Sequence, residues 1–134
     1  MDRTRATRRV GLAIALGALV STCGGSSTEY LCHASSECKG SGGDDSSIVC
    51  ESSSKCEWKV GARSSALCLS SADCKLRMGD HSTADCADSS KCEVKCYGAC
   101  AVLCGAQAHC DLKCEPADTA GISCGDGRLA CGPC

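Results

Sequence analysis

Cysteine is the residue of this chain best suited to chemistry, since 17 of the 134 residues are cysteines. Cysteine thiolates bind metals and act as nucleophiles, whereas oxidised pairs cross-link small domains. The sequence Cys131-Gly-Pro-Cys134 has the spacing of a redox-active dithiol. Such a dithiol is activated at the start of a helix that lowers the pKa of its first thiol, and no residues that could form this helix follow Cys134. We therefore predict that both cysteines are structural.

A chain this rich in cysteine could instead use its thiols to bind metal ions. Chains that store metals combine many thiols with few aromatic residues and use dense Cys-x-Cys clusters, and this sequence has no Cys-x-Cys at all. Zinc bound by four clustered thiols near residues 124–134 is the remaining candidate. The histidines occupy unrelated positions and are expected on the solvated surface. They are His33, His81 and His109.

The sequence contains no motif that would indicate a hydrolase or a calcium site. The chain has no Gly-x-Ser-x-Gly motif, and neither Asp44-Asp45 nor Asp126 belongs to a complete calcium loop. Only three residues are aromatic and none is Phe, so a large apolar core around a pocket is not expected. We predict that the chain is not an enzyme and uses no catalytic residue, metal or cofactor.

The spacing of the cysteines defines an 18-residue repeat. Five Cys-x5-Cys pairs follow one another at intervals of 18 residues, which is typical of a repeat architecture. The pairs are Cys32/Cys38, Cys50/Cys56, Cys68/Cys74, Cys86/Cys92 and Cys104/Cys110. We assign residues 32–121 to five copies of this repeat and residues 122–134, which lose the register, to a Cys-rich cap.

Charge patterning within the repeat indicates stacked strands. Charged and apolar residues alternate after the second cysteine of each pair, as in a β-strand with one buried face. If the copies stack in parallel, the flanking charges form two ladders of alternating sign, which penalises a wrong register. The ladders are Glu37, Lys55, Asp73, Lys91 and Lys39, Glu57, Lys75, Glu93.

The predicted fold is therefore a small disulfide-rich all-β protein, a β-solenoid of five 18-residue coils with a cystine-rich C-terminal cap. Glycines at the same position of successive copies are expected to mark one of the turns. These glycines are Gly43, Gly61 and Gly79. The alternative is a string of disulfide knuckles or hairpins that do not stack on one another.

Two disulfide patterns remain open. Pairing within each Cys-x5-Cys would close five small rings and leave six cysteines for three more disulfides; these six are Cys96, Cys100, Cys114, Cys124, Cys131 and Cys134. Alternatively, equivalent cysteines in adjacent coils would lie about 4.8 Å apart, which is also within reach of a disulfide. Spacing alone does not determine connectivity.

The N-terminal residues have the pattern of a secretion signal. Arginines at positions 3, 5, 8 and 9 precede the apolar run 10–20, which is too short for a membrane-spanning helix. The following Val20-Ser21-Thr22-Cys23 resembles the signal of bacterial lipoproteins. This resemblance implies that residues 1–22 are removed, that Cys23 is lipidated, and that residues 23–31 form a Gly/Ser tether. The alternative is a conventional signal that is cleaved nearby and leaves Cys23 as an ordinary thiol.

Lipidation of Cys23 would also account for the odd number of cysteines, because sixteen remain for eight disulfides. The lipoprotein resemblance further implies an outer-membrane location in a Gram-negative bacterium, since Gly24 stands where an Asp would retain the protein at the inner membrane. Loss of residues 1–22 would change the formal net charge from −2 to −5. An acidic chain poor in aromatic residues is not expected to bind nucleic acid.

Two further resemblances concern the repeats. The Cys-x5-Cys pairs with intervening Ser or Thr resemble the disulfide-braced antifreeze β-helices, but the period of 18 and the scarcity of Thr do not fit an ice-binding face. Residues 92–134 resemble the Cys-rich repeats of uncharacterised bacterial lipoproteins. We expect a membrane-anchored structural or recognition scaffold with an envelope or extracellular protein or glycan as partner; a thiol-based metal-binding or redox role is the alternative.

Overall fold

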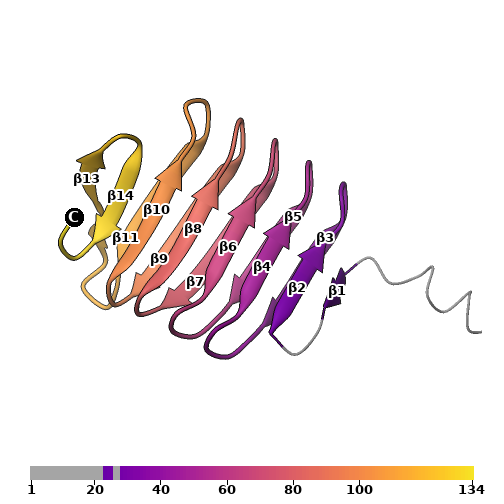
Figure 1. The fold of residues 1–134 in the computed structure, drawn as a ribbon, viewed down its shortest axis with the longest axis horizontal. Coiled ribbons are helices and arrows are strands. Elements are labelled where there is room, and N and C mark those ends of the chain that lie inside the picture. The colour runs from indigo at the N-terminus through magenta and orange to yellow at the C-terminus, as the bar shows by residue number, and fades with distance from the viewer. Residues whose placement is uncertain (1–22, 26–27) are drawn as a thin grey trace, which may run out of the picture.

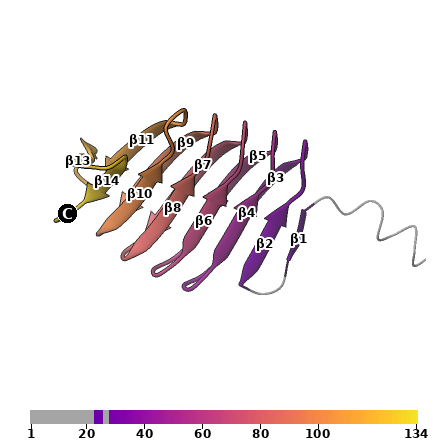
Figure 2. The same ribbon diagram turned by 45° about the horizontal axis from the view of Figure 1, so that its top comes forward.

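The computed structural model describes residues 23–25 and 28–134, which wind into a two-sided β-solenoid of about five coils (Figure 1). This confirms the predicted fold class. Each coil contributes one strand to each of two sheets. Sheet A has eight strands in the order β1-β2-β4-β6-β8-β10-β14-β13, and sheet B has six in the order β12-β11-β9-β7-β5-β3. Figure 2 shows the two sheets as two rows of strands.

The strands are short, as expected for coils of 18 residues. The strands of sheet A are β1 (Cys23–Gly25), β2 (Glu29–Cys32), β4 (Ser47–Cys50), β6 (Ser65–Cys68), β8 (Ser82–Cys86), β10 (Cys100–Cys104), β13 (Ile122–Gly125) and β14 (Arg128–Cys131). Those of sheet B are β3 (Glu37–Ser41), β5 (Lys55–Lys59), β7 (Asp73–Gly79), β9 (Lys91–Tyr97), β11 (His109–Cys114) and β12 (Thr119–Ala120).

None of the described residues belongs to a helix long and apolar enough to span a bilayer. The predicted signal peptide, residues 1–22, lies outside the described residues.

The parallel register follows the 18-residue period. Strand β5 pairs with β3 so that Lys55 lies opposite Glu37 and Glu57 opposite Lys39, and β7 and β9 continue both ladders. The predicted charge ladders are therefore present on the outer face of sheet B. Lys39 and Glu57 approach to 3.5 Å between Nζ and Oε2. A shift of one residue would bury these charges, so the pattern fixes the register.

The interior is narrow and is filled by cystine and medium-sized apolar side chains rather than by aromatic rings. Ile48, Ala66, Ala84 and Val102 succeed one another along the inner face of sheet A, and Leu76, Val94 and Leu112 do so along sheet B. All seven are at most 5% exposed. The cysteines of the repeat lie in the same interior, which replaces the large residues that the sequence lacks.

One turn of each coil lies inside the Cys-x5-Cys segment, and in the first four coils it uses a left-handed serine. Ser35, Ser53, Ser71 and Ser89 have φ between 58° and 62°. The serine that follows is buried in two of these turns, and the Ser54 hydroxyl donates to the carbonyl of Glu51 at 2.6 Å. The repeated serine is thus a turn residue with a backbone role.

The other turn follows sheet B, where the glycines at positions 43, 61 and 79 were expected. A ladder of buried serines connects successive coils there. The backbone N–H of Ser46 donates to Ser64 Oγ at 3.2 Å, and that of Ser64 donates to Ser82 Oγ at 3.1 Å. These bonds satisfy polar groups that the narrow interior would otherwise leave without partners.

The two ends of the solenoid are closed differently. At the N-terminal end β1 lies antiparallel to β2, with Cys23 opposite Cys32. At the C-terminal end β14 lies antiparallel to β10, β13 to β14, and β12 to β11. The antiparallel strands cover the parallel edges at β2, β10 and β11, which would otherwise offer free hydrogen-bonding groups to another chain. Among the described strands, β3 forms the end of sheet B.

Candidate functional site

Eight disulfides cross-link the described residues, and four of them close a Cys-x5-Cys ring of the repeat. These four are Cys50–Cys56, Cys68–Cys74, Cys86–Cys92 and Cys104–Cys110. Three more involve only the six cysteines outside the repeat pairs: Cys96–Cys100, Cys114–Cys131 and Cys124–Cys134. Equivalent cysteines of adjacent coils stack in register but do not bond to each other.

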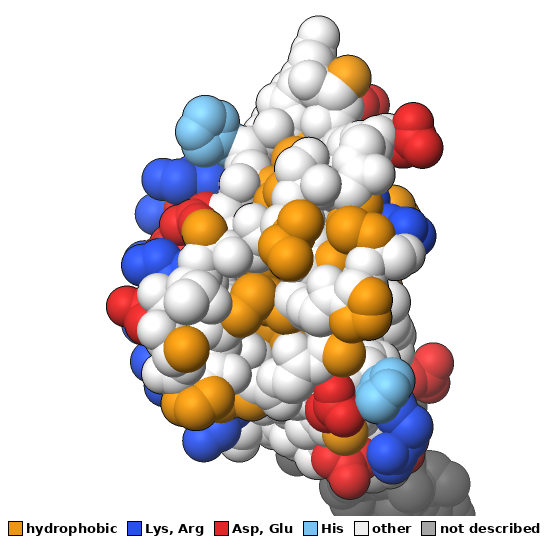
Figure 3. All heavy atoms as spheres, turned by 90° about the vertical axis from the view of Figure 1, so that its left-hand side faces the viewer, with side chains coloured by type: hydrophobic (Ala, Val, Ile, Leu, Met, Phe, Trp, Pro, Cys, Tyr) orange, Lys and Arg blue, Asp and Glu red, His pale blue; other side chains and the backbone are white. Residues whose placement is uncertain are grey.

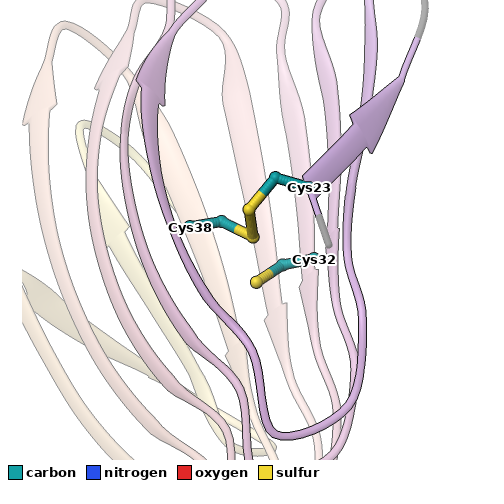
Figure 4. A group of neighbouring side chains, drawn as sticks. All are labelled: Cys23, Cys32 and Cys38. Atoms are coloured by element: carbon teal, nitrogen blue, oxygen red, sulfur yellow. A yellow bond between two sulfur atoms is a disulfide. The ribbon is translucent and has the colours of Figure 1, made fainter. Parts of the chain in front are cut away.

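The first coil departs from this pattern. Cys38 is bonded to Cys23 rather than to Cys32, and Cys32 is a free, buried cysteine (Figure 4). Cys32 was predicted to be in a disulfide and is free here, whereas Cys23 is bonded. The reason is geometric, because the antiparallel pairing of β1 with β2 brings Cys23 directly opposite Cys32 and within reach of Cys38. Lipidation of Cys23 stays a prediction. The Sγ atoms of the three residues lie within 4.8 Å of one another.

The surroundings of Cys32 keep its thiol protonated. Its Sγ is 3.6 Å from the carbonyl oxygen of Ser36 and 3.8 Å from that of Lys55, and either oxygen can accept the single thiol proton. Burial raises the pKa of the Cys32 thiol above its usual value; a hydrogen bond with Ser54 opposes the shift, and the charge of Glu51 adds to it. A protonated thiol is a poor nucleophile and a poor metal ligand.

Two further groups of three sulfur atoms lie close enough for a metal ion, namely Cys50/Cys56/Cys74 and Cys68/Cys86/Cys92. Every member of both groups is bonded in a disulfide. A disulfide sulfur offers no thiolate to a metal, so these groups reflect the stacking of cystines in a narrow interior. The zinc candidate near residues 124–134 is likewise occupied by two disulfides.

The two cysteines of Cys131-Gly-Pro-Cys134 belong to different disulfides, with Cys114 and Cys124 respectively. They do not form a dithiol pair with each other, and no helix adjoins them in the described part of the chain. This arrangement fits the structural role that the sequence analysis assigned to them.

The histidines and the acidic loops are dispersed along the molecule. His33 and His81 pair with Glu51 and Asp80 at 3.3 and 2.9 Å. Asp44 and Asp45 face Arg63, whose Nε donates to Asp45 Oδ1 at 3.0 Å. This guanidinium holds the pKa of Asp45 below its usual value. Arg63 offsets one of the two negative charges of Asp44 and Asp45, which weakens the attraction of this loop for a calcium ion.

The outer face of sheet B carries a feature that the sequence analysis did not interpret. Beside the two alternating ladders runs a third series of outward residues in register, and four of its five members are cationic. These are Lys59, Arg77, Lys95 and Lys113, preceded by Ser41. An open groove of about 380 Å³ on this face is lined by charged residues of this series and its neighbour, including Lys75, Arg77 and Glu93.

Comparison with known protein families, with curated proteins and with solved structures found no match for this chain.

Proposed function

We propose that this protein is a rigid scaffold of the bacterial cell envelope, structural or for recognition, anchored to a membrane through a lipid on Cys23. The observation that carries the proposal is the bracing of the solenoid by eight disulfides. Structural disulfides on this scale form and persist outside the cytoplasm. The signal pattern in residues 1–22 agrees with export.

The position of Cys23 suits an anchor at one end of a rod. Strand β1 lies at the N-terminal end of the solenoid, and the antiparallel cap lies at the other end (Figure 1). A lipid on Cys23 would leave the coils projecting away from the point of attachment. Both sheets would then remain accessible to a partner.

A lipid on Cys23 requires that Cys38 take another partner. Cys32 is the replacement, since it occupies the repeat position that bonds across the ring in the next three coils. In an unmodified chain the same state is reached by thiol–disulfide exchange. The exchange begins with loss of the Cys32 proton, a step that burial of the thiol opposes and that a higher pH favours. The resulting thiolate attacks Cys38 Sγ, the Cys32–Cys38 bond forms, and Cys23 leaves as a thiolate that takes up a proton. The number of disulfides is unchanged, so no oxidant is consumed.

The test is the full chain with Cys32→Ser, expressed in a Gram-negative host and extracted in detergent. If Cys23 is lipidated, Cys38 has no partner, and alkylation labels one thiol, on Cys38, in a membrane-associated protein. If Cys23 is not lipidated, Cys23 and Cys38 remain bonded, no thiol is labelled, and the anchor is refuted. The matched variant Cys23→Ser is expected in the soluble envelope fraction, with Cys32 bonded to Cys38.

A further inference from the structure

The cationic series on the outer face of sheet B forms a continuous column. Lys59 pairs in register with Arg77, Arg77 with Lys95, and Lys95 with Lys113, so that successive charges are separated by one strand spacing of about 4.8 Å. We call these four residues the cationic column. Lys59, Arg77 and Lys113 are exposed and Lys95 is half-buried. Within the described residues, no carboxylate lies within ion-pair distance of any of the four.

The cationic column does not serve folding. Like charges directly opposite each other on adjacent strands destabilise a sheet, whereas opposite charges stabilise it. The two neighbouring ladders alternate in sign from β3 to β9, for example Glu57 between Lys39 and Lys75. Only at β11 does one of them repeat a sign, where Asp111 lies opposite Glu93. The column, which is subject to the same geometry, repeats one sign over four coils. A feature that opposes folding and recurs at one position of the repeat points to a binding role.

The charge of the whole molecule reinforces this contrast. The outer face of sheet B holds eight of the ten Lys and Arg residues in 23–134 and five of the fifteen Asp and Glu residues. The face therefore carries a formal charge of +3, while residues 23–134 together carry −5. In Figure 3, which looks onto the C-terminal end, Lys and Arg side chains follow the left-hand edge of the molecule. An anion is attracted to this face and repelled by the rest of the surface.

We propose that the cationic column binds a linear anionic polysaccharide lying along the solenoid axis. A linear chain can follow the column and avoid the acidic residues of the neighbouring ladder, such as Glu57, Glu93 and Asp111. A flat anionic membrane would meet these carboxylates together with the lysines. Tyr97 lies two residues beyond Lys95 on the same face and is 47% exposed. An exposed aromatic ring beside the column offers a surface on which a sugar ring can stack.

The proposed polysaccharide is a partner for the scaffold function and rests on that proposal. Binding to the cationic column does not require the lipid on Cys23. The experiment measures binding of polygalacturonate to the full chain in non-ionic detergent, with neutral dextran as the negative control. We expect saturable binding that weakens as salt rises from about 50 to about 200 mM, as ion release from a polyanion requires. Replacing the four column residues by Gln should weaken binding at least about tenfold.

The control variant removes the same charge from the same face. It replaces Lys55 and Lys91, which belong to the ladder farther from the column, by Gln, and it is compared with a variant in which Lys59 and Lys95 of the column are replaced by Gln. Its binding should stay within about threefold of the parent. Equal losses in both variants would overturn the column as the site, and absence of binding would overturn the polysaccharide. Binding only to vesicles containing phosphatidylglycerol would assign the face to a membrane instead. If the extracted protein carries no lipid on Cys23 but still binds polygalacturonate, the lipid anchor is refuted and the polysaccharide site is not.

Discussion

At the scale of single residues, the first coils are fitted around one aromatic pair. Trp58 packs against Tyr30 with ring centroids 4.6 Å apart, and it occupies the inner position that Gly40 holds in the preceding coil. A Cβ atom on Gly40 would lie 2.5 Å from the ring of Trp58. Gly40 therefore makes room for the Trp58 ring, which is partly buried against the end of the core.

We predict that Gly40→Ala destabilises the protein by about 1–3 kcal/mol, because the methyl group cannot be accommodated without moving the Trp58 ring. The matched control is Gly43→Ala, since a Cβ atom at Gly43 meets nothing within 4 Å. Denaturant midpoints followed by tryptophan fluorescence measure the difference. Equal stability of the two variants would contradict this packing.

A second residue-scale feature is the hydrogen bond by which Asp80 holds the next coil. The backbone N–H of Ala99 donates to Asp80 Oδ1 at 2.6 Å, and His81 lies 2.9 Å from Oδ2. The bond from Ala99, with a smaller contribution from His81, lowers the pKa of Asp80 below its usual value of 3.8. Because the folded state favours the ionised form, this stabilisation is present at neutral pH and is lost as the pH falls below 3.8.

Asp80→Ala should therefore lower the melting temperature at pH 7, and the gap to the parent should narrow as the pH falls toward 2. Asp85→Ala, on an exposed position of β8, is the control and should change little at either pH. If the difference in melting temperature between Asp80→Ala and the parent is the same at every pH, the carboxylate charge is not involved.

At the scale of elements, the charge ladders of sheet B fix the register of the parallel strands. Lys75 lies between Glu57 and Glu93, and Arg77 lies between Lys59 and Lys95. The same substitution at these two positions has opposite electrostatic consequences, although the residues share one strand and one face.

Lys75→Glu would place four carboxylates in a row, because Asp111 already lies opposite Glu93, and should destabilise the protein by about 1 kcal/mol at low salt. Arg77→Glu would make the cationic column alternate and should leave stability unchanged or raise it. Both differences should shrink in high salt, because the groups are exposed. Urea midpoints of the two variants at two salt concentrations test this; a loss of stability in Arg77→Glu equal to that in Lys75→Glu would contradict it.

The sequence was sufficient to predict these elements because every coil repeats the same local pattern. Cys56, Cys74 and Cys92, with their flanking charges, specify strand, face and register at once. The ends of the solenoid lack this repetition. The bond between Cys23 and Cys38 arises from an antiparallel strand within the segment that was predicted as a tether. The pairing of Cys131 with Cys114 likewise depends on how β14 returns along β10.

The four basic residues of the cationic column recur at intervals of 18 in the sequence, but this spacing alone does not indicate a binding surface. Its interpretation required two facts that only the fold supplies. Lys59, Arg77 and Lys95 had to be in register on neighbouring strands. Their side chains also had to lack ion pairs with the carboxylates of the described residues. The adjacent ladders, in which positive and negative charges alternate, then provide the comparison that shows the single sign of the column to be unusual.

At the scale of the whole molecule, disulfides take over the role of a large apolar core. The chain has one Trp, two Tyr and no Phe, so burial of aromatic surface contributes little. Each coil contacts mainly its neighbours, as in other solenoids, and stability accumulates coil by coil. The cross-links within the coils limit how far the unfolded chain can expand.

Removal of one central disulfide by Cys68→Ala with Cys74→Ala should lower the free energy of unfolding by about 2–3 kcal/mol, since the bond closes a small ring in the middle of the stack.

Complete reduction should unfold the solenoid and expose it to proteolysis. Far-ultraviolet circular dichroism and limited proteolysis before and after reduction provide the measurement. A reduced chain that keeps its β-structure and its protease resistance would contradict the scaffold role of the cystines.

The most direct test of a lipid-anchored, fully cross-linked rod is the intact mass of the full chain extracted from a Gram-negative envelope. The mass is measured after alkylation, with and without prior reduction. We predict a chain that begins at Cys23, carries a diacylglycerol-sized increment on that residue, and takes up no alkyl group until it is reduced. An unmodified Cys23 would contradict the anchor, and four or more alkylated thiols before reduction would contradict the scaffold.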